Sequence, residues 1–100
     1  MVRLLALLML FAAQPAMSQV WAEEKCRLYG QAWQEATRQR GIQGLSAGFL
    51  AAHDRFLAGG CSDKAVCPRS EAEVAMADLM TIMALNARIA GTFLPFLCRS

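Results

Sequence analysis

The single histidine is the first candidate for a catalytic group in this 100-residue chain. His53 is followed by Asp54, but neighbouring residues on a helix point about 100° apart, so these two side chains do not form an oriented dyad. The sequence also contains no G-x-S-x-G, H-E-x-x-H or phosphate-loop pattern. We therefore expect His53 to be a packed or partly exposed residue, and we expect no catalytic site and no enzymatic activity.

Three methionines, Met76, Met80 and Met83, are spaced to share one face of a helix. Thioether sulfurs bind copper(I), so a copper-handling protein is one function compatible with this face. The same spacing is also that of an ordinary buried stripe, and no second histidine or methionine cluster accompanies it. We therefore expect these side chains to belong to the core, and we expect no metal site and no cofactor.

Four cysteines, Cys26, Cys61, Cys67 and Cys98, all lie beyond the N-terminal apolar segment. In a short exported chain, an even set of cysteines is typical of a disulfide framework. A zinc site is the alternative, but the spacing lacks a C-x-x-C pair and thiolates do not persist in an oxidising compartment. The cysteines therefore predict two disulfide bonds.

The N-terminal residues have the layout of a secretory signal peptide. A basic start at residues 1–3 is followed by the apolar residues 4–13, and then by Gln14 and Pro15. An apolar run of that length spans only ~15 Å as a helix, against a hydrocarbon core of ~30 Å. We therefore expect a cleaved leader and no stable membrane insertion.

The small residues that follow the apolar run offer two cleavage points, after Ser18 or after Ala22. We favour Ala22, because alanine is the commoner residue just before the cut. The chain then divides into a signal peptide, 1–22, and a helical domain, 23–100. Together with the cysteines, the leader predicts a periplasmic or secreted protein.

The charge balance of residues 23–100 is close to neutral. Arg3 leaves with the leader, so nine of the ten basic residues remain beside eight acidic ones. A domain that binds nucleic acid by neutralising phosphates carries a basic excess, so nucleic acid is not an expected partner. The length allows a single domain.

Apolar residues recur at helical spacing in three segments, and no useful length of the sequence alternates as a strand does. The sequence therefore predicts an all-α fold, a small three-helix, disulfide-stapled domain with a short C-terminal segment. Pro95 limits that last segment to a helical turn at best. The expected helices cover residues 23–40, 46–58 and 71–90, and the C-terminal segment covers residues 92–100.

Glycines and one capping pattern mark the ends of these helices. Gly41 can adopt the left-handed conformation that closes the first helix, and Gly59 with Gly60 ends the second. Ser70 and Glu73 have the spacing of a capping box, which starts the third helix. Gly91 is expected to stop it.

The length of the third helix decides which cysteines we expect to meet. The twenty residues from Glu71 to Ala90 rise ~30 Å, whereas the seven residues from Thr92 to Cys98 reach at most ~23 Å. Cys67 should then lie beyond the reach of Cys98, unless the third helix ends early. The predicted pairs are Cys26 with Cys98 and Cys61 with Cys67, and the alternative pairs are Cys26 with Cys61 and Cys67 with Cys98.

The third helix is apolar on two sides, so both must be covered or one is left as a surface for interaction. The first arc carries no charge, and we expect it to form the core. It consists of Met76, Leu79, Met80, Met83 and Ala87, with Trp33, Phe49 and Phe56 as its expected core partners.

The second arc mixes apolar and acidic residues, which is typical of an interface with a polar rim. We expect it to be a candidate interface. In the alternative, the tail from Phe93 to Leu97 folds back over Leu85 and Ile89. The candidate interface consists of Val74, Asp78, Ile82, Leu85 and Ile89, with Glu71 at its edge.

These features predict a small exported helical protein that binds an unknown protein partner or forms a homodimer. One alternative is a periplasmic chaperone for acid stress, because the eight carboxylates of the chain titrate on acidification. Copper handling by the methionine face is another.

Three short pieces of the chain resemble small periplasmic immunity proteins, which neutralise toxins of contact-dependent secretion systems. They are Gly48-Phe49-Leu50 with Asp54, Cys67-Pro68, and Pro95-Phe96-Leu97-Cys98. The segment between Cys67 and Cys98 is too short for the usual complement of helices in that family. The resemblance implies a toxin-neutralising, protein-binding role.

Overall fold

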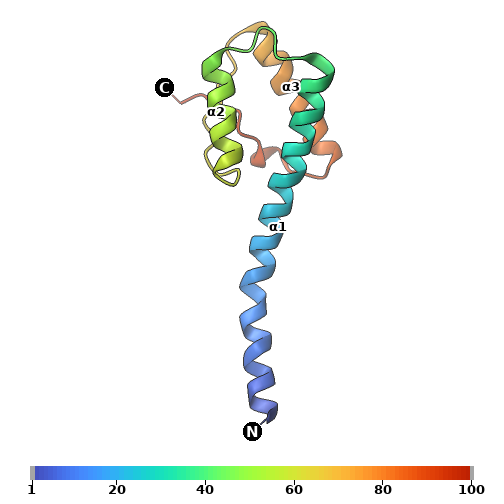
Figure 1. The fold of residues 1–100 in the computed structure, drawn as a ribbon, viewed down its shortest axis with the longest axis vertical. Helices are drawn as coiled ribbons and strands as arrows, with labels where there is room; N and C mark the ends of the chain where they lie inside the picture. The colour runs from blue at the N-terminus through green and yellow to red at the C-terminus, as the bar shows by residue number, and fades with distance from the viewer. Residues whose placement is uncertain (1, 100) are drawn as a thin grey trace.

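The computed structural model describes the backbone of residues 2–99 and the side chains of residues 19–99. Three α-helices and one short 3-10 helix make up the regular structure, and residues 2–99 contain no strand (Figure 1). The predicted all-α fold is thus confirmed. The elements are α1 (Val2–Arg40), α2 (Ala47–Ala58), α3 (Glu71–Asn86) and η1 (Gly91–Phe93).

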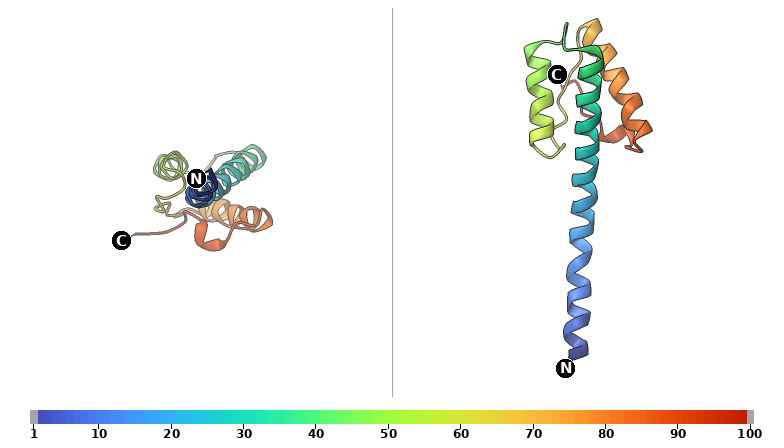
Figure 2. Two further views of the ribbon diagram at one scale, coloured as in Figure 1. Left: turned by 90° about the horizontal axis from the view of Figure 1, so that it is seen from below. Right: turned by 45° about the vertical axis from the view of Figure 1, so that its right-hand side comes forward.

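The helix α1 is much longer than expected. Its C-terminal half packs with α2 and α3, whereas its N-terminal half projects away from them, which gives the molecule extents of 65 × 28 × 18 Å (Figures 1 and 2). The helix predicted over 23–40 therefore continues back through the segment predicted as a leader to Val2. Within the part of the chain that the structure describes, no helix is both long and apolar enough to cross a membrane.

The core lies where the two shorter helices and the C-terminal tail meet the second half of α1. Large side chains from all of these elements are fully buried there. Trp33, Phe49, Phe56, Met76 and Met80 all belong to this cluster, in agreement with the core partners expected for the first arc. The largest fully buried side chains are Tyr29, His53, Phe56, Val66, Met80, Ile89 and Pro95.

The helix α2 starts and ends as its sequence predicts. Ser46 is the N-cap, and its side chain accepts a hydrogen bond from the backbone N–H of Phe49. At the other end Gly60 has a φ of 73°, and the backbone N–H of Cys61 donates to the carbonyl of Phe56 at 2.8 Å. This is the Schellman arrangement, in which a left-handed residue just past the helix satisfies the last carbonyls.

The helix α3 begins as predicted but ends early. The capping box of Ser70 and Glu73 is present. The last helical residue is Asn86, because Arg88 adopts a φ of 64° and the backbone N–H of Ile89 donates to the carbonyl of Ala84 at 2.9 Å. This is a second Schellman arrangement, with an arginine at the position that glycine usually occupies. The expectation that Gly91 stops the helix is wrong.

The early end of α3 overturns the predicted disulfide pairing. Cys26 is bonded to Cys61 with a Cα–Cα distance of 5.6 Å, and Cys67 is bonded to Cys98 at 4.5 Å. The pairs Cys26–Cys98 and Cys61–Cys67 were therefore wrong. A helix of 16 residues rises only ~24 Å, and the tail that follows Asn86 is long enough to return along it.

Backbone hydrogen bonds hold the returning tail beside the segment that connects α2 and α3. The N–H of Val66 donates to the carbonyl of Pro95 at 3.0 Å, and the N–H of Leu97 donates to the carbonyl of Val66 at 3.1 Å. The Cys67–Cys98 bond fastens the same two segments one residue further along. Two disulfides fit an oxidising compartment.

Candidate functional site

Three large apolar side chains of α3 face solvent. Val74 is 44 % exposed, Ile82 57 % and Leu85 54 %. Asp78 and Glu71 are exposed as well. With successive residues about 100° apart, all five fall within about 80° of one another and form a single stripe. We call the stripe of Glu71, Val74, Asp78, Ile82 and Leu85 the α3 outer face.

Ile89 does not belong to this face, although the sequence placed it there. It is only 1 % exposed, because the turn at Arg88 folds it under the end of α3 and against the core. The alternative, in which the tail folds back over Leu85 and Ile89, does not hold for Leu85. Phe93, Leu94 and Phe96 instead pack against the core cluster, and Leu85 stays exposed.

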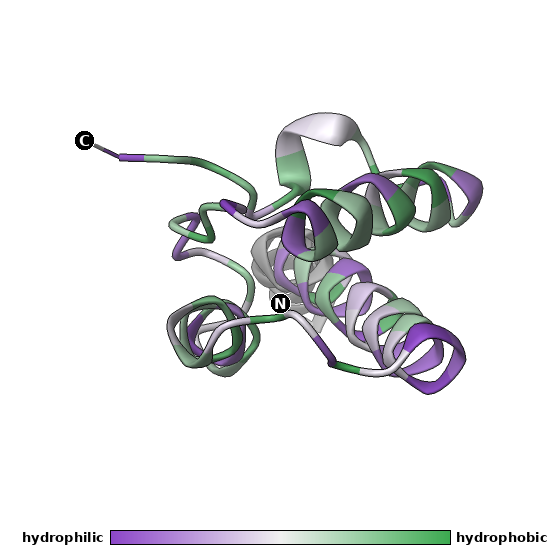
Figure 3. Cartoon of the chain, turned by 90° about the horizontal axis from the view of Figure 1, so that it is seen from above, coloured by the Kyte–Doolittle hydropathy of each residue, from purple (hydrophilic) through white to green (hydrophobic). Residues whose placement is uncertain are grey.

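The opposite side of α3 is buried, as expected for the first arc. Met76 and Met80 belong to the core cluster, and Leu79 and Met83 pack against it half-buried. In Figure 3, coloured by hydropathy, α3 carries green, apolar positions along its length, whereas the last turn of α1 is purple. The helix therefore supplies apolar side chains to the core and to solvent alike.

The methionines lie among carbon-rich side chains. Met76 and Met80 are closed off from solvent in the same cluster as Trp33, Phe49 and Phe56. Among the residues that the structure describes, no three His, Cys, Asp or Glu side chains are grouped so as to hold a metal ion. The geometry of the methionine face is that of packing.

His53 lies at the centre of an aromatic cluster and has no exposed surface. Its ring stacks on Trp33 with 3.7 Å between centroids, and Phe96 of the tail stacks with it at 6.3 Å. Nε2 lies 2.8 Å from the hydroxyl of Tyr29, within hydrogen-bond distance. Nδ1 is buried and has no hydrogen-bond partner among the described residues. The sequence predicted a packed or partly exposed residue but not the bond to Tyr29.

Burial decides the ionisation of this pair. Loss of hydration lowers the pKa of His53 to about 4 and raises the pKa of Tyr29 well above its usual range. Both groups are therefore neutral at physiological pH. Asp54 is exposed and is not drawn into the cluster, in agreement with the expectation that these neighbours form no dyad.

Glu73 is a buried carboxylate with a wider role than its capping box. Its Oε1 accepts hydrogen bonds from the backbone N–H groups of Arg69 and Ser70, and its Oε2 accepts one from Ser46 at 2.8 Å. These donors lower its pKa to about 2. Because Ser46 is the N-cap of α2, one carboxylate joins the starts of two helices. The S-x-x-E pattern signals the local bonds, but it does not signal a contact with a residue 27 positions away.

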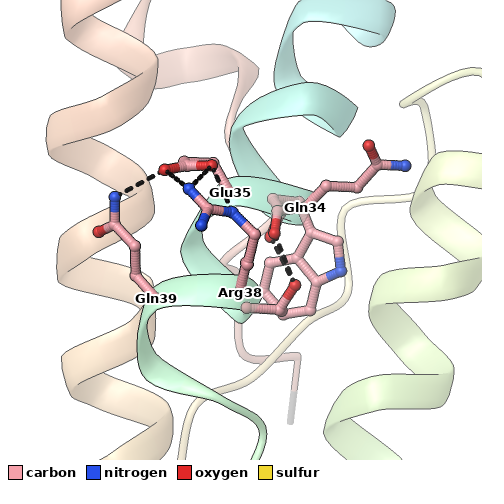
Figure 4. A network of polar contacts seen from close by, with 6 residues as sticks. Gln34, Glu35, Arg38 and Gln39 are labelled. Atoms are coloured by element: carbon pink, nitrogen blue, oxygen red, sulfur yellow. Dashed lines mark hydrogen bonds and ion pairs between the residues drawn. The ribbon is translucent and has the colours of Figure 1, made fainter.

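The exposed side of α1 differs in chemistry from the α3 outer face. Arg38 donates to Glu35 through Nε at 3.0 Å, and Gln39 donates to the same carboxylate at 2.8 Å (Figure 4). Arg27 and Glu24 form a similar ion pair nearer the N-terminus of the same helix. Two glutamates of this helix therefore each lie beside an arginine of opposite charge.

An open hollow of about 460 Å³ lies between residues 22–30 of α1 and the end of α2 at Leu57 and Gly60. Ala22, the favoured cleavage residue, lies in its wall. Removal of residues 1–22 would therefore change the shape of this hollow. The charged residues at its edge are Glu23 and Arg27, and they do not make a catalytic combination.

In comparisons with known proteins, the chain matches no protein-family model, no curated protein and no solved structure. The assignment of a function therefore rests on the residues of the chain and their arrangement.

Proposed function

We propose that this is a small exported helical protein that acts by binding another protein through the α3 outer face, without catalytic chemistry of its own. The observation that carries the proposal is the exposure of Val74, Ile82 and Leu85 on one stripe of a helix whose other side already fills the core. The proposal places residues 1–22 as a cleaved signal peptide and the domain of residues 23–100 in the periplasm or outside the cell.

Export is supported by the basic and apolar leader and by the use of every cysteine in a disulfide. Two bonds also stabilise a domain of this size. A domain of about 80 residues buries a small core, and a disulfide that closes a loop of 31 or 35 residues contributes roughly 3–4 kcal/mol by restricting the unfolded chain. The disulfides therefore have an adequate structural reason and need no redox role.

Protein binding is supported by the composition of the α3 outer face. Exposed apolar side chains that are close together and edged by charged residues are typical of an interface with a polar rim. Asp78 and Glu71 supply that rim, and both are exposed beside the three apolar residues. A catalytic function has less support, because His53 is sealed among aromatic rings.

A variant of Leu85 tests the proposal. Leu85→Glu places a charge on an exposed position, so the variant should keep its helical circular dichroism and its melting temperature but lose partner binding and any self-association. Ala51→Glu is the matched control, because it adds the same charge to an exposed position of α2. The readouts are retention of proteins from the native exported fraction and sedimentation of the purified chain. If Leu85→Glu melts early and loses several kcal/mol of the free energy of unfolding, Leu85 belongs to a packed surface and the proposal is contradicted.

An acid-responsive chaperone is a second candidate, and His53 is the observation that favours it. A histidine without exposed surface and with an unpartnered Nδ1 resists protonation in the folded state, so acidification disfavours that state. The aromatic cluster it would disrupt includes Phe96 of the tail. Exposure of apolar dye-binding surface near pH 4, together with suppression of the aggregation of a client protein, would support this candidate.

A further inference from the structure

We propose that the partner of the α3 outer face is a cationic amphipathic segment, a helix that presents apolar side chains flanked by Lys or Arg, and not a second copy of this chain. The inference rests on the proposed function and adds the chemistry of the partner to it.

The shape of the stripe fits a partner helix. The stripe extends from Glu71 to Leu85, a rise of ~21 Å, which is about four helical turns. Its members follow the i, i+3 and i+4 spacing that forms a ridge on the helix surface. A second helix with apolar residues at the same spacing can pack such a ridge into its own groove, burying Val74, Ile82 and Leu85 together.

The charge of the stripe selects a cationic partner. Glu71 and Asp78 both lie within the stripe, and neither makes an ion pair among the described residues, whereas Glu24 and Glu35 on α1 are each paired with an arginine. None of the five positions is Lys or Arg. Two carboxylates without an ion-pair partner, beside three apolar side chains, complement a segment that carries Lys or Arg next to its apolar face.

Symmetry disfavours pairing with a second copy. Asp78 is the middle residue of the stripe, so an antiparallel pair with full overlap places the two Asp78 side chains opposite each other and Glu71 opposite Leu85. A shift by four residues places Asp78 opposite Ile82 instead. A parallel pair aligns Asp78 with Asp78 and Glu71 with Glu71. Each arrangement either repels or buries a carboxylate against an apolar side chain, which is costly.

Two synthetic helical peptides test this inference. Both are 18-residue peptides with the same leucine stripe, one flanked by Lys and Arg and the other by Glu. Their affinities for the disulfide-bonded chain are measured by fluorescence anisotropy at low and high salt. We expect the cationic peptide to bind about tenfold or more tightly at low salt, with a smaller difference at high salt because screening weakens exposed charges.

The charge-reversal variant Asp78→Lys should reduce the preference for the cationic peptide by about threefold to tenfold, the size expected for a charge at an interface rim. Asp54→Lys is the matched control, because it reverses an exposed carboxylate on α2 and has the same net charge as Asp78→Lys. It should leave the preference unchanged within about twofold. Melting temperatures of both variants should match that of the parent chain, because both positions are exposed.

The outcomes separate this inference from the proposed function. Equal binding of the two peptides, or equal effects of Asp78→Lys and Asp54→Lys, overturns the cationic partner while leaving a loss on Leu85→Glu in support of the surface. Absence of binding by either peptide also overturns it. Self-association that Leu85→Glu abolishes identifies a second copy as the occupant. Early melting of Leu85→Glu removes the surface itself and both proposals with it.

Discussion

Both sides of α3 carry large apolar side chains, but the environments of the two sides are opposite. Met76, Met80 and Ala84 on the inner side are buried against α1, α2 and the tail, whereas Val74, Ile82 and Leu85 on the outer side are about half exposed. The core is therefore complete without the outer side. Apolar composition alone does not decide burial here. Burial also requires another element that covers the second face. The tail does not cover it, because the tail is hydrogen-bonded to Val66.

The largest expected effect contrasts one residue from each side. Met80→Ala removes a fully buried side chain and should cost about 2–5 kcal/mol of the free energy of unfolding, because it leaves a cavity. Ile82→Ala, two positions away on the outer side, should cost no more than about 0.5 kcal/mol. Urea unfolding of the two variants measures both values. Equal losses would show that the two sides of α3 do not differ as described.

Acidification should affect the buried side through His53. The pKa of this histidine is lowered to about 4 in the folded state, so between the unfolded value of 6.5 and pH 4 the unfolded chain binds more protons. Stability is therefore complete above pH 6.5 and falls as the pH drops toward 4, by about 3 kcal/mol in all. Urea unfolding at pH 7, 6, 5 and 4 measures the loss.

The variant His53→Phe provides the control for that prediction. Phenylalanine keeps an aromatic ring beside Trp33 and carries no titrating group. The stability of this variant should change little between pH 6.5 and 5, a window above the ordinary range of the carboxylates. A slope as steep as that of the parent chain would assign the pH dependence to other groups.

Two glutamates on the first turn of α3, Glu73 and Glu71, should differ in what they contribute to stability. Glu73→Gln removes the charge that accepts three backbone N–H groups and should cost about 1–2 kcal/mol at pH 7, whereas Glu71→Gln on the outer face should cost under about 0.5 kcal/mol. Because the pKa of Glu73 is lowered to about 2, its contribution is present above pH 4.5 and is lost as the pH falls toward 2. Thermal unfolding at pH 7 and pH 2 tests this. If Glu73→Gln is still less stable than the parent chain by the same amount at pH 2, the charge of Glu73 is not the cause of the difference.

The smallest expected effect lies at the C-terminal end of α3. Arg88 has a φ of 64°, a conformation that glycine adopts at lower cost, so Arg88→Gly should raise the free energy of unfolding by up to about 1 kcal/mol. Ala87→Gly, one residue earlier at a φ of −88°, should give no gain. Differential scanning calorimetry resolves the difference. Destabilisation by Arg88→Gly would mean that the arginine side chain does more than occupy the turn.

The start of α3 was predictable because local side chains encode it. Ser70 and Glu73 are three residues apart, and the bonds of the capping box depend on little else. The end of α2 was predictable for the same reason, since Gly59 and Gly60 follow its last residue and Gly60 adopts the left-handed conformation. The end of α3 was not, because Arg88 takes a conformation that its residue type does not announce.

That single helix end explains two wrong predictions. With α3 extended to residue 90, Ile89 belongs to the outer stripe and Cys98 lies out of reach of Cys67. With α3 ended at Asn86, Ile89 turns inward and the tail returns to Cys67. The three exposed apolar members of the candidate interface were predicted from periodicity, whereas the link from Glu73 to Ser46 joins residues that no local pattern connects.

The order of the disulfides along the chain has a consequence for how the protein matures. The first cysteine is bonded to the second and the third to the fourth, so the two covalent loops follow one another without overlapping. A polypeptide that meets an oxidant while it emerges from its N-terminus can close the Cys26–Cys61 loop before Cys98 has appeared. Joining each cysteine to the next one to arrive yields the native bonds, so this order of formation leaves no mispaired intermediate for an isomerase to correct.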